Sequence, residues 1–462
     1  MTHTICISPV DGSEFARRSI ASDAEIEAVF AGARAAQRDW ARQPIAERAR
    51  LCSAMVDAML AMRDEIIPEL AWQMGRPVGS GGGELGGFEE RARAMIALAD
   101  RALAPVVPDA KEGFTRYIRR DPLGVVLTIA PWNYPYLTAV NSIVPALMAG
   151  NAVVLKHAAQ TLLAGERFEA ACDNAGLPQG LFTNICLSHG QVAKIIGARL
   201  ADQVNFTGSV AAGKTIEQAA AGQFIGLGLE LGGKDPAYVR ADADLDFAVE
   251  NTVDGAFFNS GQSCCGIERI YVHDSLFDPF VEKFVETTRG YVLGDPLDPA
   301  TTLGPMVKAA AADFVRGQIA DAVEAGATAH IDPKDFARDA AGSPYMAPQV
   351  LTGVTHDMSV MTEESFGPVV GIMKVSGDEE AVRLMNDSDY GLTASIWTAD
   401  QTAAEAIGGE IETGTVFMNR ADYLDPMLAW TGVKDTGHGA TLSQVGYEML
   451  TRPKSFHLRH RG

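Results

Sequence analysis

Cysteine is scarce in this chain of 462 residues, which contains six cysteines in all. None of them belongs to a CxxC pair or to a Cys/His cluster with the spacing of a zinc site, so the sequence predicts no metal site. So few thiols in so long a chain also exclude the disulfide framework of a small secreted domain. The fold must therefore depend on large hydrophobic cores.

Basic residues are also in short supply, because 38 Lys and Arg stand against 59 Asp and Glu and give a formal net charge of −21. An acidic surface repels phosphate backbones and anionic lipids, which argues against nucleic acid and membranes as partners. No apolar run approaches the roughly 20 residues of a membrane helix. The N-terminus has acid and glycine where a signal peptide has an apolar core, so we expect a soluble, cytoplasmic protein.

Apolar residues make up 47% of the sequence and charged residues 21%, which is typical of globular domains, and the length suffices for two or three of them. Residues 23–76 carry apolar side chains at helical spacing. The glycine-rich stretch 79–87 resembles a phosphate-binding loop, but it follows a helix and lacks a final Lys-Ser/Thr. We therefore expect a flexible connection there.

From residue 121 onwards apolar runs alternate with helical patterns, which predicts a doubly wound parallel α/β sheet. Its expected strands lie in 124–132, 151–157, 184–187 and 203–208. A second α/β domain begins near residue 232, and its apolar runs lie in 237–245, 269–277, 368–375 and 393–399. Ligands bind such sheets beyond the carboxyl ends of the strands, so the chemistry is expected at that edge.

Two segments alternate aromatic and basic residues, one at 117–124 and the other at 453–462. This pattern indicates that they pair as edge strands. The pattern alone leaves open whether the pair is a solvated fringe or an arm for oligomerisation.

Three segments combine turn residues with groups that can do chemistry. In residues 257–269, Asn-Ser-Gly leads into Cys264 and Cys265, where backbone N–H groups can lower a thiol pKa; the alternative is that both thiols fill the core. Glu230 lies inside an apolar run, either as a general base with a raised pKa or as a solvated edge residue. Asn133 ends the first strand and either donates to an oxyanion or completes a rigid turn.

A fourth segment, FTGSVAAGK at 206–214, can open a helix towards a pyrophosphate, although its spacing is not GxGxxG. Taken together, these segments closely resemble the NAD(P)-dependent aldehyde dehydrogenase superfamily, and the resemblance runs nearly end to end. The motifs that carry it, in the family's order, are PWNYP, VVLKHAAQT, FTGS, ELGGKDP, FFNSGQSCCGIER, EESFGPV, NDSDYGLTASIWT and TGVKDTGHG.

The resemblance implies an α/β fold with three parts. These are a Rossmann-like NAD(P)-binding domain at 1–111 and 126–231, a second α/β catalytic domain at 232–425, and a small β oligomerisation arm from 112–125 and 440–462. It thus favours the arm interpretation for the two edge segments, and it implies a homodimer or homotetramer acting on a small-molecule aldehyde.

The resemblance makes Cys264 the nucleophile and Cys265 its neighbour on the pocket side. Asn133 and the backbone N–H of Cys264 would hold the oxyanion, and Glu230 would activate the water that hydrolyses the thioester. Relatives that pass the acyl group to CoA characteristically lack this glutamate, so we expect the carboxylic acid as product. Two other classes are a thiol hydrolase side activity and a non-catalytic structural or binding protein on the same fold.

NAD or NADP is the implied cofactor. By resemblance, Lys156 reaches the adenosine ribose, while Gly208 and Ser209 approach the pyrophosphate. Glu364 would hold the nicotinamide ribose, with Phe366 beside the ring. The other expected cofactor-binding residues are Ile129, Pro131, Trp132, Ala159 and Leu231.

Three positions depart from the family's pattern. NAD-preferring relatives often carry a glutamate where this chain has Ala159, and its absence lets Lys156 meet a 2′-phosphate, so we expect NADP to be accepted alongside NAD. Ser142 and Thr441 stand where many relatives have a lysine and a glutamate that assist proton transfer. Glu230 is therefore expected to work with less help, or through water.

The implied substrate pocket is aromatic with a few neutral polar groups. Its expected residues are Tyr134, Thr138, Asn141, Phe258, Ser263, Cys265, Leu424 and Trp430. This lining favours an aromatic or medium-chain aldehyde, with a semialdehyde or an amino-aldehyde as the alternative. Arg420 is the nearest cation in sequence, and a solvent or structural role is favoured over binding a substrate carboxylate. Asp422 and Asp425 either attract a cationic substrate or make structural pairs.

Overall fold

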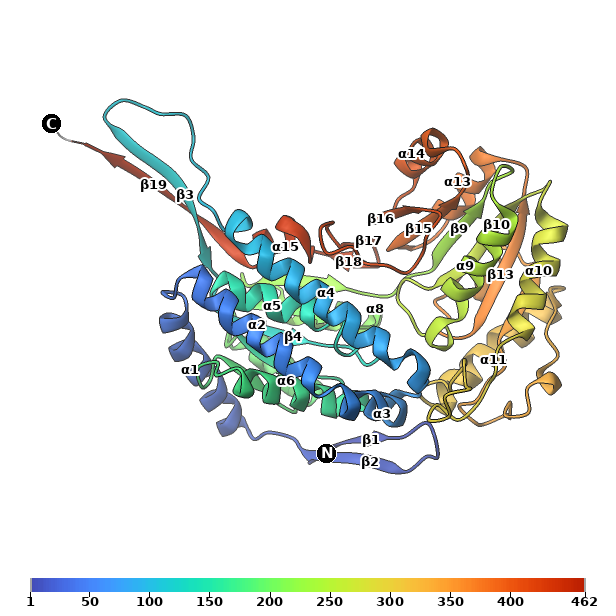
Figure 1. Cartoon of the computed structure of the whole chain (residues 1–462), viewed down its shortest axis with the longest axis horizontal. Coiled ribbons are helices and arrows are strands. Elements are labelled where there is room, and N and C mark those ends of the chain that lie inside the picture. Colours follow the sequence, from blue (N-terminus) through green and yellow to red (C-terminus); the bar gives the residue numbers. More distant parts are fainter. Residues whose placement is uncertain (1, 461–462) are drawn as a thin grey trace.

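The two expected α/β units are present in the computed structural model, which describes residues 2–460 (Figure 1). Each unit is built on its own sheet, and the sheets are separate from each other and from a long two-stranded antiparallel ribbon that projects from the body (Figure 1). Within residues 2–460, the helices are all too short or too polar to cross a membrane. The α/β class expected from the sequence is confirmed.

The first sheet has six strands in the order β18-β8-β7-β4-β5-β6. Five are parallel, and only β18 runs antiparallel to its neighbour. The strands are β4 (Val125–Ile129), β5 (Ala152–Lys156), β6 (Phe182–Asn184), β7 (Gln203–Thr207), β8 (Gly226–Glu230) and β18 (Gly437–His438). The central strands β4 and β5 are buried apart from Lys156, as expected of a parallel sheet covered on both faces.

Eight helices accompany this sheet in the described chain. They are α1 (Asp23–Trp40), α2 (Ile45–Ala61), α3 (Arg63–Met74), α4 (Val78–Ala102), α5 (Val140–Ala149), α6 (Leu162–Asn174), α7 (His189–Gly197) and α8 (Val210–Ala220). Local signals set their ends: Ser22 and Glu25 form a capping box at the start of α1, and Gly150 ends α5 in the left-handed conformation, at φ 94°. Helix α4 packs against α2, α3 and α5.

The second sheet has seven strands in the order β11-β12-β13-β10-β9-β15-β16, and all but β11 run parallel to their neighbours. The strands are β9 (Asp235–Val239), β10 (Ile267–His273), β11 (Thr328–Ala329), β12 (Gln349–Thr352), β13 (Val369–Val375), β15 (Thr393–Trp397) and β16 (Thr415–Met418). Its helices are α9 (Leu245–Phe257), α10 (Phe277–Arg289), α11 (Ala309–Glu324), α12 (Ser359–Thr362), α13 (Asp378–Asn386) and α14 (Gln401–Glu410).

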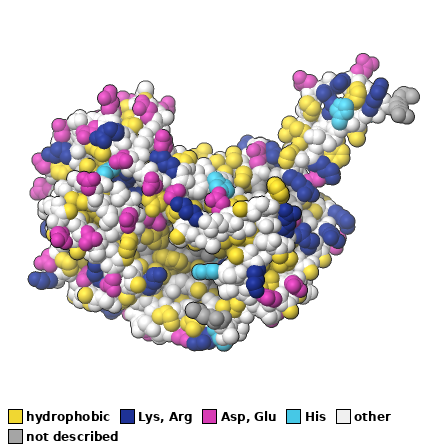
Figure 2. Space-filling view, turned by 180° about the vertical axis from the view of Figure 1, so that it is seen from behind, with side chains coloured by type: hydrophobic (Ala, Val, Ile, Leu, Met, Phe, Trp, Pro, Cys, Tyr) yellow, Lys and Arg dark blue, Asp and Glu magenta, His cyan; other side chains and the backbone are white. Residues whose placement is uncertain are grey.

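The two segments that alternate aromatic and basic residues do pair. Strand β3 (Phe114–Pro122) runs antiparallel to β19 (Thr451–Arg459), and the rings of Tyr117 and Phe456 stack with centroids 4.6 Å apart. This two-stranded ribbon stands out from the body, with hydrophobic and basic side chains along it (Figure 2). Residues 461–462 of the predicted arm lie outside the described residues, and a role in oligomerisation stays a prediction.

The remaining short elements connect these parts. Strands β1 (His3–Ile7) and β2 (Glu14–Ser19) form an N-terminal hairpin, and β14 (Tyr390–Gly391) pairs with β17 (Val433–Lys434). Helix α15 (Ser443–Met449) precedes β19 and packs on α4 and α5.

The strand expected at 184–187 was placed too late. The strand at this place is β6, and its residues 182–184 pair with Val153 to Leu155 of β5. Because β5 ends at Lys156, little remains beyond Asn184 for a longer strand to pair with.

The expectation of a flexible connection at 79–87 was wrong, because these residues form the start of α4. Several of the glycines serve close packing rather than flexibility. A Cβ at Gly81 would lie 2.9 Å from Ile67 of α3, and a Cβ at Gly87 would collide with Leu137. Contact with neighbouring elements thus overrides the low helix propensity of glycine. The segment places Glu84 in the protein interior, where it becomes important for the site.

Candidate active site

A cavity of about 400 Å³ contains most of the residues singled out by the sequence. It is lined by segments of both units, including α4, the turn after β4, and the loops around Cys264 and Asp422. All eight residues expected in the substrate pocket line it, together with Cys264, Glu230 and Leu231. Asn133 does not line the cavity, but it lies against the turn that carries Cys264. The fold therefore brings the expected catalytic and pocket residues together, while their roles stay predictions.

The turn before Cys264 has an unusual backbone. Asn259, Ser260 and Gly261 all have positive φ, at 54°, 57° and 70°. For the two non-glycine residues this conformation is strained, and such strain persists only where surrounding contacts hold it. Gln262 supplies contacts of this kind, because its amide donates to the Asn259 carbonyl at 3.1 Å and accepts from the Val307 N–H at 2.8 Å.

The two neighbouring cysteines have different surroundings. Cys264 is half-buried at the cavity, whereas Cys265 is fully buried and its Sγ donates to Oδ1 of Asp422 at 2.8 Å. A hydrogen bond with Cys264, together with burial, raises the pKa of the Cys265 thiol well above its usual value. The Cys265 thiol therefore stays protonated, and the role of Cys264 as the nucleophile stays a prediction. The sequence left open whether Asp422 attracts a cationic substrate or makes structural pairs. In the structure its carboxylate accepts hydrogen bonds from Cys265, Ser263 and Tyr134, all of which line the cavity.

Asn133 is buried and fixed on both sides. Its amide nitrogen donates to the Gln262 carbonyl at 3.3 Å, two residues before Cys264. Its own carbonyl accepts from Nη2 of Arg76 at 2.5 Å and from the Asn259 amide at 3.3 Å. The side chain is thus held next to the cysteine turn, as an oxyanion donor has to be.

A buried ion pair that the sequence did not predict supports this arrangement. Arg76 and Glu84 are each only 2% exposed, and Nη1 of Arg76 donates to Oε2 of Glu84. The other oxygen of Glu84 accepts the N–H groups of Tyr136 and Leu137, both at 2.9 Å. The pair therefore ties α4 to the turn that begins with Asn133. The only sequence signal was a lone acid in a glycine-rich stretch.

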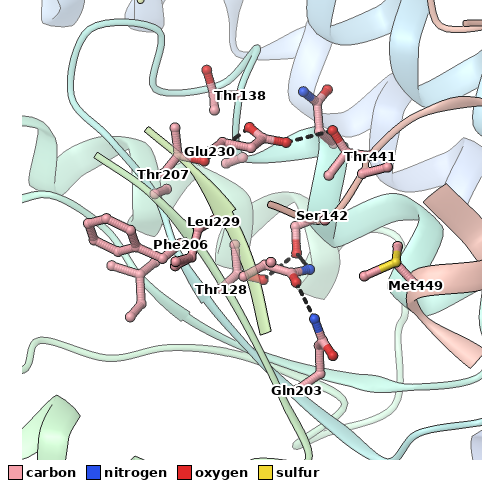
Figure 3. A pocket seen from close by; sticks show the side chains of 18 of the residues that line it. Thr128, Thr138, Ser142, Gln203, Phe206, Thr207, Leu229, Glu230, Thr441 and Met449 are labelled. Atoms are coloured by element: carbon pink, nitrogen blue, oxygen red, sulfur yellow. Dashed lines mark hydrogen bonds between the residues drawn. The ribbon is translucent and has the colours of Figure 1, made fainter. Parts of the chain in front are cut away.

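Glu230 is the last residue of β8, and two threonine hydroxyls donate to it (Figure 3). Thr441 lies 2.6 Å from Oε1 and Thr207 lies 3.2 Å from Oε2. Burial raises the pKa of the Glu230 carboxyl, although both hydrogen bonds partly oppose the shift. Ser142 does not contact Glu230; its hydroxyl bonds to Thr128 and to Asn205, both at 2.8 Å (Figure 3).

Several expected cofactor residues gather at the carboxyl edge of the first sheet. Lys156 ends β5, and no carboxylate in residues 2–460 forms an ion pair with it, while burial lowers the pKa of its amine. Ala159, at the start of the next short helix, is exposed and carries no charge. Gly208 and Ser209 precede α8, whose first N–H groups are free to meet an anion apart from the Ala212 N–H, which donates to Ser209 Oγ at 3.4 Å.

The loop 364–366 faces this edge from the second unit and is held by a buried carboxylate. Glu268 accepts the N–H groups of Ser365 and Phe366 at 2.8 and 2.9 Å, and it pairs with Lys234 at 2.5 Å. Burial is the main cause that raises the pKa of Glu364 to about 7, and repulsion from the negative charge of Glu268 is the second cause. Neither Lys234 nor Glu268 was singled out by the sequence, because each looks like an ordinary charged residue beside a strand.

The remaining expected cofactor residues lie near β4 and β8. The ring of Phe366, which has a φ of 49°, meets the half-buried Trp132 edge-on at 5.6 Å. Ile129 and Pro131 line a smaller cavity behind Glu230. Leu231 is buried directly after β8.

These residues suit a nicotinamide dinucleotide. The Lys156 amine, which forms no ion pair within the described residues, fits the adenosine end, and the opening of α8 fits a pyrophosphate. A Cβ at Gly232 would collide with the Glu364 carboxylate, so the glycine leaves this acid room to reach a ribose hydroxyl. The residues expected to hold the cofactor therefore fit it.

Comparison with known proteins supports the same interpretation. The sequence profile of the Aldehyde dehydrogenase family matches residues 2–456. A protein of Mycobacterium avium (strain 104) named succinate-semialdehyde dehydrogenase (NADP(+)) is 35% identical over 452 residues, which cover 97% of this chain and 95% of that protein.

Solved structures agree as well. Gox0499 superimposes with a TM-score of 0.94 at 32% identity, and the match covers 99% of this chain and 100% of Gox0499. PnpE of Pseudomonas sp. WBC-3, solved in complex with nicotinamide adenine dinucleotide, has a TM-score of 0.94 at 29% identity, covering 100% of this chain and 95% of PnpE.

The buried Arg76–Glu84 pair gives a first prediction. Arg76→Met leaves Glu84 charged and unpaired in the interior, so the free energy of unfolding should fall by about 3–5 kcal/mol in chemical denaturation. Arg50→Met is the matched control, because Arg50 pairs with Glu47 at the surface, and its loss should cost less than about 1 kcal/mol. Equal effects of the two substitutions would contradict a supporting role for the buried pair.

Proposed function

Because the chain belongs to the aldehyde dehydrogenase family, we propose that it oxidises an aldehyde to the carboxylic acid with NAD(P)+ through a thioester on Cys264. One observation carries the proposal. Cys264 and Glu230 line the same cavity, and Asn133 is fixed against the Cys264 turn. A nucleophile, a base and an oxyanion donor are thus available to one substrate.

The first step forms a bond between the Cys264 sulfur and the aldehyde carbon. The carbonyl oxygen becomes an oxyanion, which the Asn133 amide and the Cys264 backbone N–H stabilise. The Asn133 amide is already held by Gln262 at 3.3 Å, so it needs little reorganisation as charge develops. The thiohemiacetal carbon then loses its hydrogen as a hydride and becomes a thioester. When bound, NAD(P)+ supplies the acceptor for that hydride and its two electrons.

Hydrolysis completes the reaction. Glu230 takes a proton from water, the resulting hydroxide adds to the thioester carbon, and the carbon–sulfur bond breaks to release the acid and the Cys264 thiolate. A carboxylate with a raised pKa is a better base near neutral pH than an ordinary glutamate. The protons of Thr441 and Thr207 keep the carboxylate oriented.

For the substrate, we propose a semialdehyde, which carries a carboxylate as well as the aldehyde. The Mycobacterium avium relative, which is named succinate-semialdehyde dehydrogenase (NADP(+)), supports this alternative. The preference for an aromatic or medium-chain aldehyde, drawn from the pocket lining, stays a prediction that none of the comparisons tests.

Domain roles are proposed on the same basis. Residues 1–111 and 126–231 bind the cofactor, 232–425 carry the catalytic cysteine, and 112–125 with 440–462 form an arm between subunits. Assembly as a homodimer or homotetramer and a cytoplasmic location stay predictions from the sequence.

A burst experiment tests the proposed reaction. Glu230→Gln should still form the thioester, so rapid mixing should show about one NAD(P)H per site, followed by steady turnover reduced roughly 100- to 10,000-fold. Cys264→Ala should show neither burst nor turnover, since no thioester can form. A full burst in Cys264→Ala would refute the assigned nucleophile.

The environment of Glu230 predicts a pH dependence. The base works only when deprotonated, so hydrolysis should fall as the pH drops through its raised pKa. Thr441→Val removes a hydrogen bond that lowers this pKa, and the acid limb of the kcat profile should therefore move to higher pH. Thr207→Val should act in the same direction with a smaller effect, because its bond is longer. A shift to lower pH would argue against this assignment.

Cofactor choice is tested at Ala159. The wild type should accept NADP with a kcat/KM comparable to that for NAD, because Lys156 forms no ion pair with a carboxylate in residues 2–460 and Ala159 adds no negative charge. Ala159→Glu should lower kcat/KM for NADP by roughly tenfold or more while sparing NAD, through repulsion of the 2′-phosphate. Ala159→Gln is the neutral control. A hundredfold NAD preference in the wild type would contradict the prediction.

A further inference from the structure

One buried cation in the cavity has no use in the proposed mechanism. Arg91 is 6% exposed and lines the cavity, yet no carboxylate in residues 2–460 lies within ion-pair distance of its guanidinium. Burying a guanidinium without a negative partner is strongly unfavourable. By contrast, the buried Arg76 nearby has its partner in Glu84.

The fold holds Arg91 in a fixed position. It lies on α4 one turn after Gly87, where the missing Cβ lets Leu137 approach the helix. Nη1 of Arg91 donates to the Leu137 carbonyl at 2.7 Å and, more weakly, to Oδ1 of Asn141 at 3.4 Å. Its Nε and Nη2 make no hydrogen bond within the described chain.

Asn141 adds a second unused donor at the same place. It is 2% exposed and lines the cavity, and its Nδ2 is buried without a hydrogen-bond partner in the described chain. Buried amide groups without partners are uncommon in folded proteins. Two neighbouring side chains therefore offer N–H groups that the protein itself does not satisfy.

The three acids whose charges act on Arg91 accept their hydrogen bonds from other groups. Glu84 pairs with Arg76 and accepts two backbone N–H groups. Asp422 accepts from Cys265, from Ser263 and from Tyr134. Glu230 accepts from its two threonines. None of these carboxylates hydrogen-bonds to the Arg91 guanidinium within residues 2–460, so its Nε and Nη2 remain available to a ligand.

We propose that Arg91, assisted by Asn141, binds the carboxylate of the substrate while the aldehyde at its other end meets Cys264. A guanidinium binds a carboxylate in the bidentate manner with well-defined geometry, which gives selectivity over a neutral aldehyde of the same length. This inference rests on the proposed function and assigns its substrate recognition to one residue. Arg420 is the competing cation, but it is exposed and stacks on the Tyr423 ring, with its guanidinium 3.5 Å from the ring centroid.

The test compares two substrates of equal carbon count, succinate semialdehyde and butanal. Arg91→Gln should lower kcat/KM for succinate semialdehyde roughly 10- to 100-fold, mainly through KM, and change kcat/KM for butanal less than about threefold. Arg91→Lys keeps the charge but loses the bidentate geometry, so its decrease in kcat/KM for succinate semialdehyde should be intermediate. Arg93→Gln is the matched control, because this surface arginine on the same helix pairs with Asp57 and Glu89 outside the cavity.

A calorimetric measurement of succinate binding separates this inference from the proposed reaction. The wild type should bind succinate, and Arg91→Gln should weaken that binding by a similar factor, even if no aldehyde is turned over. Absence of turnover by the wild type with every aldehyde would contradict the proposed function but not the binding role of Arg91.

Three results would overturn the role of Arg91. The first is an equal loss of kcat/KM for succinate semialdehyde and butanal in Arg91→Gln. The second is an unchanged preference of Arg91→Gln for succinate semialdehyde, and the third is the loss of that preference in Arg420→Gln instead. If Arg91→Gln does not fold, the comparison is made with Arg91→Lys. A purely structural role of Arg91 would lower kcat/KM for both substrates by the same factor.

Discussion

The buried ion pair between Arg76 and Glu84 is the contact on which the site depends. Glu84 comes from a glycine-rich stretch that becomes helical only because its glycines pack closely against Ile67 and Leu137. Through its second oxygen the carboxylate fixes the turn after β4, and through Arg76 it fixes the Asn133 carbonyl. One interaction thus links a helix of the first unit to the oxyanion donor, and its removal leaves a charge in the interior.

Strained backbone and buried polar support occur together around this pair. The left-handed residues 259–261 place Cys264 at the cavity, and Gln262 holds them by bonds to its own turn and to Val307. Across the cofactor edge, Phe366 has a similar conformation and is held by Glu268. Such strain persists because the surrounding contacts over-determine it, and it gives the reacting groups positions that need little adjustment.

The carboxylates and the buried guanidinium groups of the cavity differ in how far the protein itself satisfies them. The carboxylates of Glu84, Glu230 and Asp422 each receive hydrogen bonds from the protein. Arg91 alone among the buried lining cations lacks a carboxylate within the described residues. An anionic substrate would give Arg91 the partner that it lacks, which is the basis of the proposed semialdehyde preference.

The sequence by itself determined the fold class, the approximate positions of the main strands along the chain, and the segments that carry Cys264, Glu230 and Asn133. These depend on local pattern, because apolar runs, turn residues and motif spacing are written along the chain. It misjudged the glycine-rich helix, since glycine's low propensity is overridden only by neighbours that are far away in sequence. Arg76, Glu84, Glu268 and Arg91 look like any charged residue of a helix, a strand or a connecting segment. Only the tertiary structure decided which of these charges meet a partner in the interior and which one remains for a ligand, because burial and pairing are properties of contacts between distant segments.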